Sequence, residues 1–137
     1  MKVLIDTNVI LDVLMKREPH YYHSGELLRL CGIKITGCMT ASQTTDIFYL
    51  LRRYGKDTRS AKSIIKKLCD NIEMIDVNGA DVQNALAADM DDYEDALLAY
   101  CARRHETDYV ITRNVNDFIS SPVPAFSPEK FVEMSVS

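Results

Sequence analysis

The amino-acid sequence predicts an α/β protein in which helices cover both faces of one parallel sheet. Short apolar stretches rich in branched side chains alternate with longer segments whose apolar residues recur every three or four positions. This alternation is typical of parallel sheets, because the connection between two parallel strands is long enough to form a helix that packs on the sheet. We therefore expect a single domain over residues 1–137, built as a three-layer α/β/α sandwich with a central parallel sheet of four to five strands.

The predicted strands are the short apolar stretches. Val3, Leu4 and Ile5 are consecutive aliphatic residues, which indicates a strand buried on both faces. Residues 108–112, with the sequence DYVIT, have the same character. The remaining expected strands are residues 33–39, residues 72–77 and, if the sheet has a fifth strand, a short edge strand within residues 122–128.

The segments between these strands have the spacing and the end signals of helices. Pro19 suits the first turn of a helix, and Gly32 suits its end. Thr40 or Ser42 can cap the start of the helix that follows. We expect helices at about residues 9–15, 19–31, 41–55, 58–69, 79–86 and 93–104, and a last helical turn at 128–134.

The composition is that of a globular protein, with 47% hydrophobic and 26% charged residues. No apolar run approaches the roughly 20 residues that a membrane-spanning helix needs, and the first residues lack the pattern of a signal peptide, so we expect a cytoplasmic protein. The cysteines lie far apart in apolar stretches, and we expect buried, reduced thiols rather than zinc ligands. They are Cys31, Cys38, Cys69 and Cys101.

The net charge of −4 conceals two segments of opposite charge. Residues 52–67 contain seven arginines and lysines against one acid, Asp57, whereas residues 89–95 contain five acids and no base. An acidic chain is not expected to bind polyanions in general, but a separate basic segment can bind phosphate groups locally. The alternative for that segment is a solvated helix face.

Asp6 follows directly on the expected strand at 3–5 and is the first candidate for a functional site. A carboxylate at the end of a buried strand is costly unless a partner compensates its charge. In open α/β sheets, ligands bind at the carboxyl ends of the strands. The sequence therefore predicts that Asp6 lies where such proteins usually bind a ligand.

Further acids lie at suggestive positions along the chain. Asp92 and Asp95 are three residues apart and share one face of the expected helix. Asp46 interrupts an apolar helical segment, and Asp117 follows the strand at 108–112. Carboxylates brought together raise one another's pKa unless a hard cation such as Mg²⁺ neutralises them. Each acid could instead lie on a solvated surface or shape a turn.

The order of these acids and their flanking residues resembles the PIN-domain nucleases over nearly the whole chain. VLIDTNVILDVL is similar to the opening strand and Asp-Thr/Ser-Asn motif of the family, and ASQTTDIFYLLRR to the helix with the second acid. DYEDALLAYCARRHETDYVITRNVNDF is similar to its most recognisable block. The resemblance implies the catalytic acids Asp6, Asp46, Asp95 and Asp117, the metal ligands Asp6, Asp95, Asp46 and Asp92, and the supporting residues Thr7, Asn8, Thr112 and Asn114.

The resemblance also implies an activity and partners. PIN-domain nucleases use Mg²⁺ or Mn²⁺ to hydrolyse phosphodiester bonds, and for this chain the implied substrate is single-stranded RNA. Small PIN domains of this size resemble the VapC-type toxin ribonucleases of bacterial toxin–antitoxin pairs, so a small antitoxin protein is the expected partner, and the chain could form a homodimer. Arg52 and Arg53 lie roughly 10 Å beyond Asp46 along the same expected helix and are the predicted RNA-backbone contacts.

The sequence departs from the family pattern at two positions. The second acid is commonly glutamate but is Asp46 here, and position 114 is Asn where many relatives have Asp. These departures leave open a second function, namely a PIN-like module that binds RNA or protein with little or no cleavage. A third function, phosphoryl transfer through Asp6, would need an Asp-x-Asp motif or a glycine-rich phosphate loop beside it, and DTN is neither.

Overall fold

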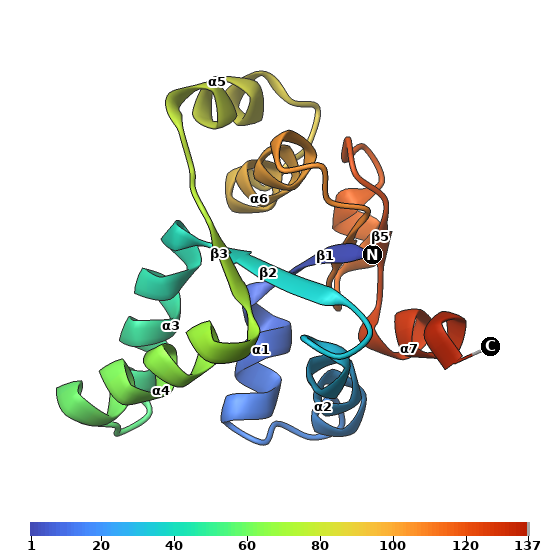
Figure 1. Ribbon diagram of the computed structural model, residues 1–137. Helices are drawn as coiled ribbons and strands as arrows, with labels where there is room; N and C mark the ends of the chain where they lie inside the picture. The colour runs from blue at the N-terminus through green and yellow to red at the C-terminus, as the bar shows by residue number, and fades with distance from the viewer. Residues whose placement is uncertain (137) are drawn as a thin grey trace.

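A parallel sheet of five strands forms the middle layer of the protein in the computed structural model, which describes residues 1–136 (Figure 1). The strand order is β3-β2-β1-β4-β5, so β1 lies at the centre. Val3 of β1 pairs with Gly37 of β2 and with Tyr109 of β4, and every strand pairing is parallel. The strands are β1 Lys2–Ile5, β2 Thr36–Thr40, β3 Glu73–Ile75, β4 Tyr109–Ile111 and β5 Ala125–Phe126.

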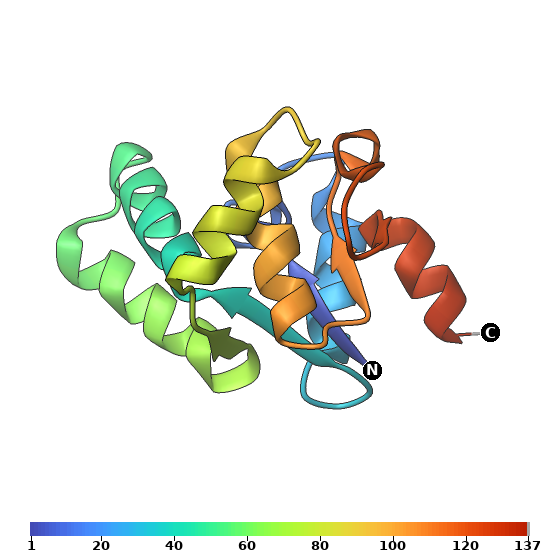
Figure 2. The ribbon, with the colours of Figure 1, turned by 90° about the horizontal axis from the view of Figure 1, so that it is seen from above.

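Helices cover both faces of the sheet, which confirms the predicted three-layer sandwich. The helices α5 and α6 lie on one face, and α1, α2, α3, α4 and α7 lie on the other (Figures 1 and 2). A short 3-10 helix, η1, follows β4. The helices are α1 Thr7–Leu14, α2 Tyr21–Leu30, α3 Ala41–Arg53, α4 Thr58–Asn71, α5 Gly79–Ala87, α6 Tyr93–Arg104, η1 Val115–Phe118 and α7 Pro128–Val136.

The central strand contributes side chains to two separate cores. Val3 and Ile5 pack in the core shared with α1, α2, α3, α4 and α7. Leu4, which points to the opposite face, packs with Leu98 and other residues of α6. Val3, Leu4 and Ile5 are fully buried, as the sequence predicted. The carboxyl end of β1 is therefore held rigidly from both sides, and the next residue along the chain is Asp6.

Ion pairs fix α6 against its neighbours at the end far from Asp6. Arg104 donates from Nε to the buried carboxylate of Asp81 in α5, at 2.9 Å, and from Nη2 to Asp76 after β3, at 2.8 Å. Asp81 also accepts a hydrogen bond from the backbone N–H of Asn78, which completes a capping box at the start of α5. These contacts set the position of α6 and hence of the acids in its first turn.

Two expectations from the sequence are wrong in detail, namely the start of the second strand and the burial of Cys69. The second strand begins at Thr36 rather than at residue 33, because the N–H groups of Ile33 and Lys34 donate to the carbonyl of Leu30 and close a turn after α2. Gly32, with φ of +82°, allows that turn.

Cys69 is exposed, although the other three cysteines are buried as expected. Leu68, one position earlier in α4, occupies the buried face of that helix instead.

Within residues 1–136 no helix is both long enough and apolar enough to cross a membrane.

Candidate active site

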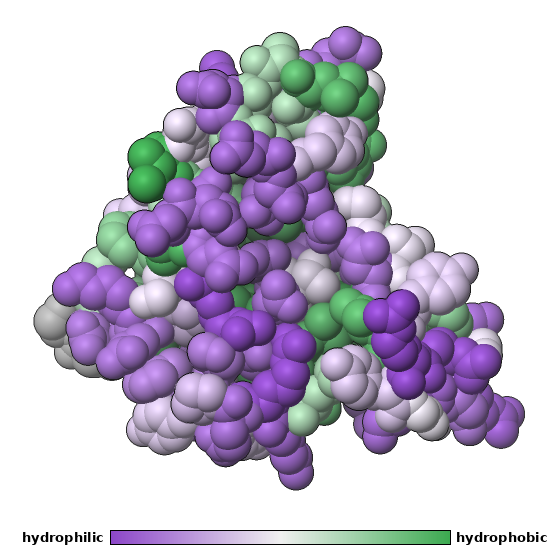
Figure 3. Space-filling model, turned by 180° about the vertical axis from the view of Figure 1, so that it is seen from behind, coloured by the Kyte–Doolittle hydropathy of each residue, from purple (hydrophilic) through white to green (hydrophobic). Residues whose placement is uncertain are grey.

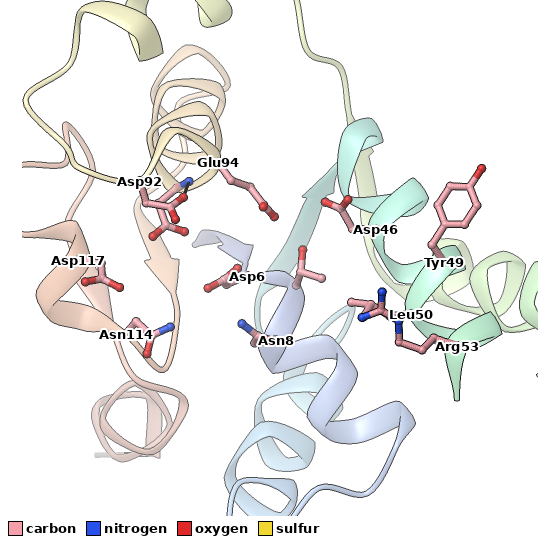
Figure 4. Close-up of a pocket in the computed structure, with 12 residues that line it drawn as sticks. Asp6, Asn8, Asp46, Tyr49, Leu50, Arg53, Asp92, Glu94, Asn114 and Asp117 are labelled. Carbon is pink, nitrogen blue, oxygen red and sulfur yellow. Dashed lines mark hydrogen bonds between the residues drawn. The ribbon is translucent and has the colours of Figure 1, made fainter. Parts of the chain in front are cut away.

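An acidic pocket of about 460 Å³ opens at the carboxyl ends of β1 and β4. Hydrophilic residues gather across the middle of the face shown in Figure 3, which views the molecule from behind. We call the cavity at the carboxyl ends of β1 and β4 the acidic pocket. Its lining comes from the start of α1, from α3, from the start of α6 and from the segment after β4, and Figure 4 shows these side chains. The lining residues are Asp6, Thr7, Asn8, Asp46, Tyr49, Leu50, Arg53, Asp92, Glu94, Asp95, Asn114 and Asp117.

Asp6 is the most deeply buried acid of this lining, with 6% of its surface exposed. Its backbone N–H donates to the carbonyl of Ile111 at 2.9 Å, which extends the pairing of β1 with β4 by one residue. Thr112, the residue after β4, donates from Oγ1 to Oδ2 of Asp6 at 2.8 Å. Burial raises the pKa of Asp6, while the Thr112 hydroxyl and the N–H of Thr7 oppose that rise. The carboxylate is thus oriented into the pocket by the neighbouring strand.

The start of α3 is tied to the end of β1 by a buried glutamine. Thr40 and Gln43 form a capping box, in which the Thr40 side chain accepts from the Gln43 N–H and the Gln43 side chain accepts from the Thr40 N–H. The amide of Gln43 also donates to the carbonyl of Ile5 at 2.8 Å and to Thr7 Oγ1 at 3.1 Å. This side chain therefore sets α3, and with it Asp46, relative to Asp6.

Asp46 lies on the wall of the acidic pocket formed by α3, exposed to solvent. In Figure 4 the side chain of Glu94, from the first turn of α6, extends across the pocket towards Asp46. Partial burial raises the pKa of Glu94, and the negative charges of Asp46 and Asp92 raise it further. Glu94 belongs to the acidic segment that the sequence showed, but its place in the lining was not predicted.

Asp95 has the most clearly perturbed carboxyl group of the pocket, with its pKa raised from 3.8 to about 7. Partial burial is the largest cause, and the charges of Asp6, Asp92, Asp117 and Glu94 follow in that order. Asp92 is the N-cap of α6 and accepts a hydrogen bond from the Asp95 N–H at 2.9 Å. Burial and the neighbouring negative charges together therefore favour the protonated form of Asp95 over a wider pH range than for a free aspartate.

The segment after β4 completes the pocket. Thr112 Oγ1, besides donating to Asp6, accepts a hydrogen bond from the backbone N–H of Asn114 at 3.1 Å. Asn114 precedes η1, Asp117 lies within η1, and both side chains line the pocket opposite α3 (Figure 4). All the acids predicted from the sequence, together with Thr7, Asn8 and Asn114, thus line one cavity, and Thr112 lies directly behind it.

A buried ionic cluster that the sequence did not reveal supports two of these segments. Asp12 of α1 is fully buried and lies 3.0 Å from Nε of Arg17 and 3.0 Å from Nε of Arg113. Arg17 also donates to the carbonyl of Asn8 at 3.0 Å. Arg113 stands between Thr112 and Asn114 in the chain. The charge of Asp12 therefore joins the start of α1 to the segment after β4, behind the pocket.

The two arginines predicted to contact RNA have different positions. Arg53 lines the acidic pocket at the end of α3, and in Figure 4 its guanidinium extends back towards Leu50. Arg52 is outside the lining and donates to the carbonyl of Lys56 at 3.3 Å. Arg53 is the one cationic side chain in the lining. Arg53 is therefore the lining residue whose positive charge can pair with a phosphate group at the pocket.

The chemistry of the lining fits a hard divalent cation. Carboxylate oxygens are the ligands that Mg²⁺ and Mn²⁺ prefer, and a cation would relieve the repulsion that raises the pKa of Asp95. Within residues 1–136, however, no three histidine, cysteine, aspartate or glutamate side chains are close enough together to form a metal site as they stand. Asp46, one methylene shorter than glutamate, lies on the α3 wall of the pocket.

Comparisons with known proteins confirm the fold. A model of the PIN domain matches residues 2–116. Ribonuclease VapC1 of Aquifex aeolicus (strain VF5) is 28% identical over 138 residues, which cover 96% of this chain and 94% of that protein. VapBC2 from Rickettsia felis, solved bound to a DNA fragment from its promoter, matches with a TM-score of 0.70 at 18% identity, over 93% of this chain and 98% of the other. A toxin–antitoxin complex from Klebsiella pneumoniae matches with a TM-score of 0.71 at 18% identity, over 92% and 97%.

Proposed function

The chain belongs to the PIN domain family, and we propose that it is a metal-dependent ribonuclease acting as the toxin of a toxin–antitoxin pair. The observation that supports the proposal most is the acidic pocket, where carboxylates from the junction of β1 and α1, from α3, from the start of α6 and from η1 converge at the carboxyl edge of the sheet. The relative from Aquifex aeolicus is named a ribonuclease, and the structure from Klebsiella pneumoniae is a toxin–antitoxin complex.

The pocket would hold Mg²⁺ or Mn²⁺ between Asp6 and Asp95, with Asp92 and Asp46 as further ligands. A bound divalent ion lowers the pKa of water and polarises a phosphate oxygen, which is the chemistry that phosphodiester hydrolysis needs. Thr112 holds the carboxylate of Asp6 in place. The remaining acids are Asp117 on η1 and Glu94 on α6, and either could accept a proton from an attacking water.

Single-stranded RNA is the proposed substrate. Arg53 would bind a phosphate next to the scissile one, and Arg52, one residue earlier on α3, would bind a phosphate further along the strand. Such contacts bind the backbone and not the sequence. The same acidic pocket suits a basic side chain of an antitoxin, which would neutralise the carboxylates and block the entry of RNA.

The proposal is tested by cleavage of a single-stranded RNA with Mg²⁺ or Mn²⁺, with and without EDTA. The native protein should cleave and should stop when EDTA is added. Asp95→Asn should abolish metal-dependent cleavage. Asp91→Asn should retain it, because this variant removes the same charge at a residue outside the acidic pocket. RNA binding without cleavage by the native protein would instead support a binding module, since Asp46 and Asn114 depart from the family's usual acids.

A further inference from the structure

An exposed aromatic ring stands beside the acidic pocket on α3. Tyr49 is 70% exposed and lines the pocket, and among the lining residues it is the one aromatic side chain. Asp46, Tyr49 and Arg53 are separated by three and four residues, so they share one face of α3. Figure 4 shows Tyr49 on this helix between the positions of Asp46 and Arg53. An acid, an aromatic ring and a guanidinium are therefore presented together by one helix at the wall of the pocket.

The ring of Tyr49 contacts one neighbouring ring, and most of its surface is exposed to solvent. Phe48, which is half-buried, meets it edge to face, with ring centroids 5.3 Å apart and planes at 85°. A tyrosine loses little conformational entropy when a ligand packs on it, because it has only two side-chain torsions. A partly fixed ring with an accessible face is the kind of surface on which a nucleobase stacks.

The distribution of charge decides on which side of the pocket an RNA strand can continue. Beside α6 and η1 the acidic pocket adjoins a second cavity, lined by Asp89, Asp91, Asp92 and Asp117, which repels phosphate groups. On the α3 side stand Arg53 and, beyond it, the basic residues of the segment 52–67. These charges favour a strand path over α3, the helix that carries Tyr49.

We propose that Tyr49 is a stacking platform for the base of the nucleotide next to the cleaved phosphate, and that Arg53 binds the phosphate of that nucleotide. The inference rests on the proposed ribonuclease function and adds to it a contact with a base. Stacking accepts any base, because every base has a π face, so Tyr49 contributes affinity and position rather than a strict sequence requirement.

The test uses short single-stranded RNAs with 2-aminopurine at successive positions, bound to the Asp95→Asn protein in the presence of Mg²⁺. Stacking on Tyr49 should quench the fluorescence of 2-aminopurine at one position. Tyr49→Ala in the same background should abolish that quenching and weaken binding by roughly 5- to 100-fold. Tyr49→Phe should preserve both, because it keeps the ring. Tyr22→Ala is the matched control, since Tyr22 is 65% exposed but lies on α2 outside the pocket.

The outcomes separate this inference from the proposed function. If the native protein cleaves RNA and Tyr49→Ala leaves quenching, affinity and cleavage unchanged, the stacking role is wrong and the exposed ring serves a protein contact instead. Equal losses in Tyr49→Ala and Tyr22→Ala would also overturn it. If the native protein binds RNA with quenching that depends on Tyr49 but never cleaves, the ribonuclease function fails while the stacking contact stands.

Discussion

Replacing Asp95 by Asn should stabilise the metal-free protein at neutral and alkaline pH. In the fold, burial and the charges of Asp6 and Asp92 raise the pKa of Asp95 from 3.8 to about 7. A carboxyl group with a raised pKa binds its proton more tightly in the folded state than in the unfolded state. Below about pH 4 Asp95 is protonated in both states and costs no stability. The free energy of unfolding falls as the pH rises from about 4 to 7, because the carboxyl group ionises more readily in the unfolded state. Above that range the full loss of stability applies.

The magnitude follows from the size of this pKa difference. About three pKa units correspond to roughly 4 kcal/mol, but Asp95 is only partly buried and solvent screens its neighbours, so we expect about 1–2 kcal/mol. For a domain of this length that is a rise in Tm of roughly 3–10 °C.

Thermal denaturation of native protein, Asp95→Asn and Asp91→Asn in EDTA measures the effect, at about pH 8 and about pH 4. Only Asp95→Asn should gain stability at the higher pH, and the gain should disappear at the lower pH. Equal Tm values for native protein and Asp95→Asn at the higher pH, or an equal gain at both pH values, would show that the ionised Asp95 carboxylate does not destabilise the metal-free fold.

Three other predictions follow from the contacts around the pocket. Thr112→Val should lower the free energy of unfolding by roughly 1–3 kcal/mol in urea denaturation, because it removes a buried hydrogen bond to the Asp6 carboxylate; no change would mean that the hydroxyl is dispensable. Asp12→Asn should cost about 3 kcal/mol, because two arginines lose a buried counter-charge, and a loss no larger than that of an exposed acid would contradict this. Arg53→Ala should reduce the salt dependence of RNA binding by roughly 0.7 in slope, and more than Arg52→Ala does; identical slopes for both variants would remove Arg53 from the RNA contact.

The fold and the position of Asp6 could be predicted from local pattern, whereas the resemblance to the PIN-domain nucleases indicated the other acids that line the pocket. A run such as Val3–Ile5 identifies a buried strand, and an acid at its end lies at the carboxyl edge of the sheet whatever the other strands do. The expected start of the second strand at residue 33 was wrong, because a turn that closes on Leu30 competes with the apolar pattern of that segment.

The residues that hold the site in place were harder to predict, because their partners are distant in the sequence. Gln43 contacts Ile5, and only the Thr-x-x-Gln spacing of the capping box pointed to it. Nothing in the sequence paired Asp12 with Arg113, which is distant in the chain. Glu94 was visible as one acid among several, but its direction across the pocket depends on how α6 packs against the sheet.

We propose that the acidic pocket binds a divalent metal ion between the end of β1 and the start of α6. Anomalous scattering at the manganese absorption edge, from crystals grown or soaked with Mn²⁺, tests it most directly. We predict a single strong peak, or a close pair, in contact with the carboxylates of Asp6 and Asp95, and its loss in crystals of Asp95→Asn. Well-ordered crystals in which manganese is absent from these two carboxylates, or binds only in the neighbouring cavity at Asp89 and Asp91, would contradict the account.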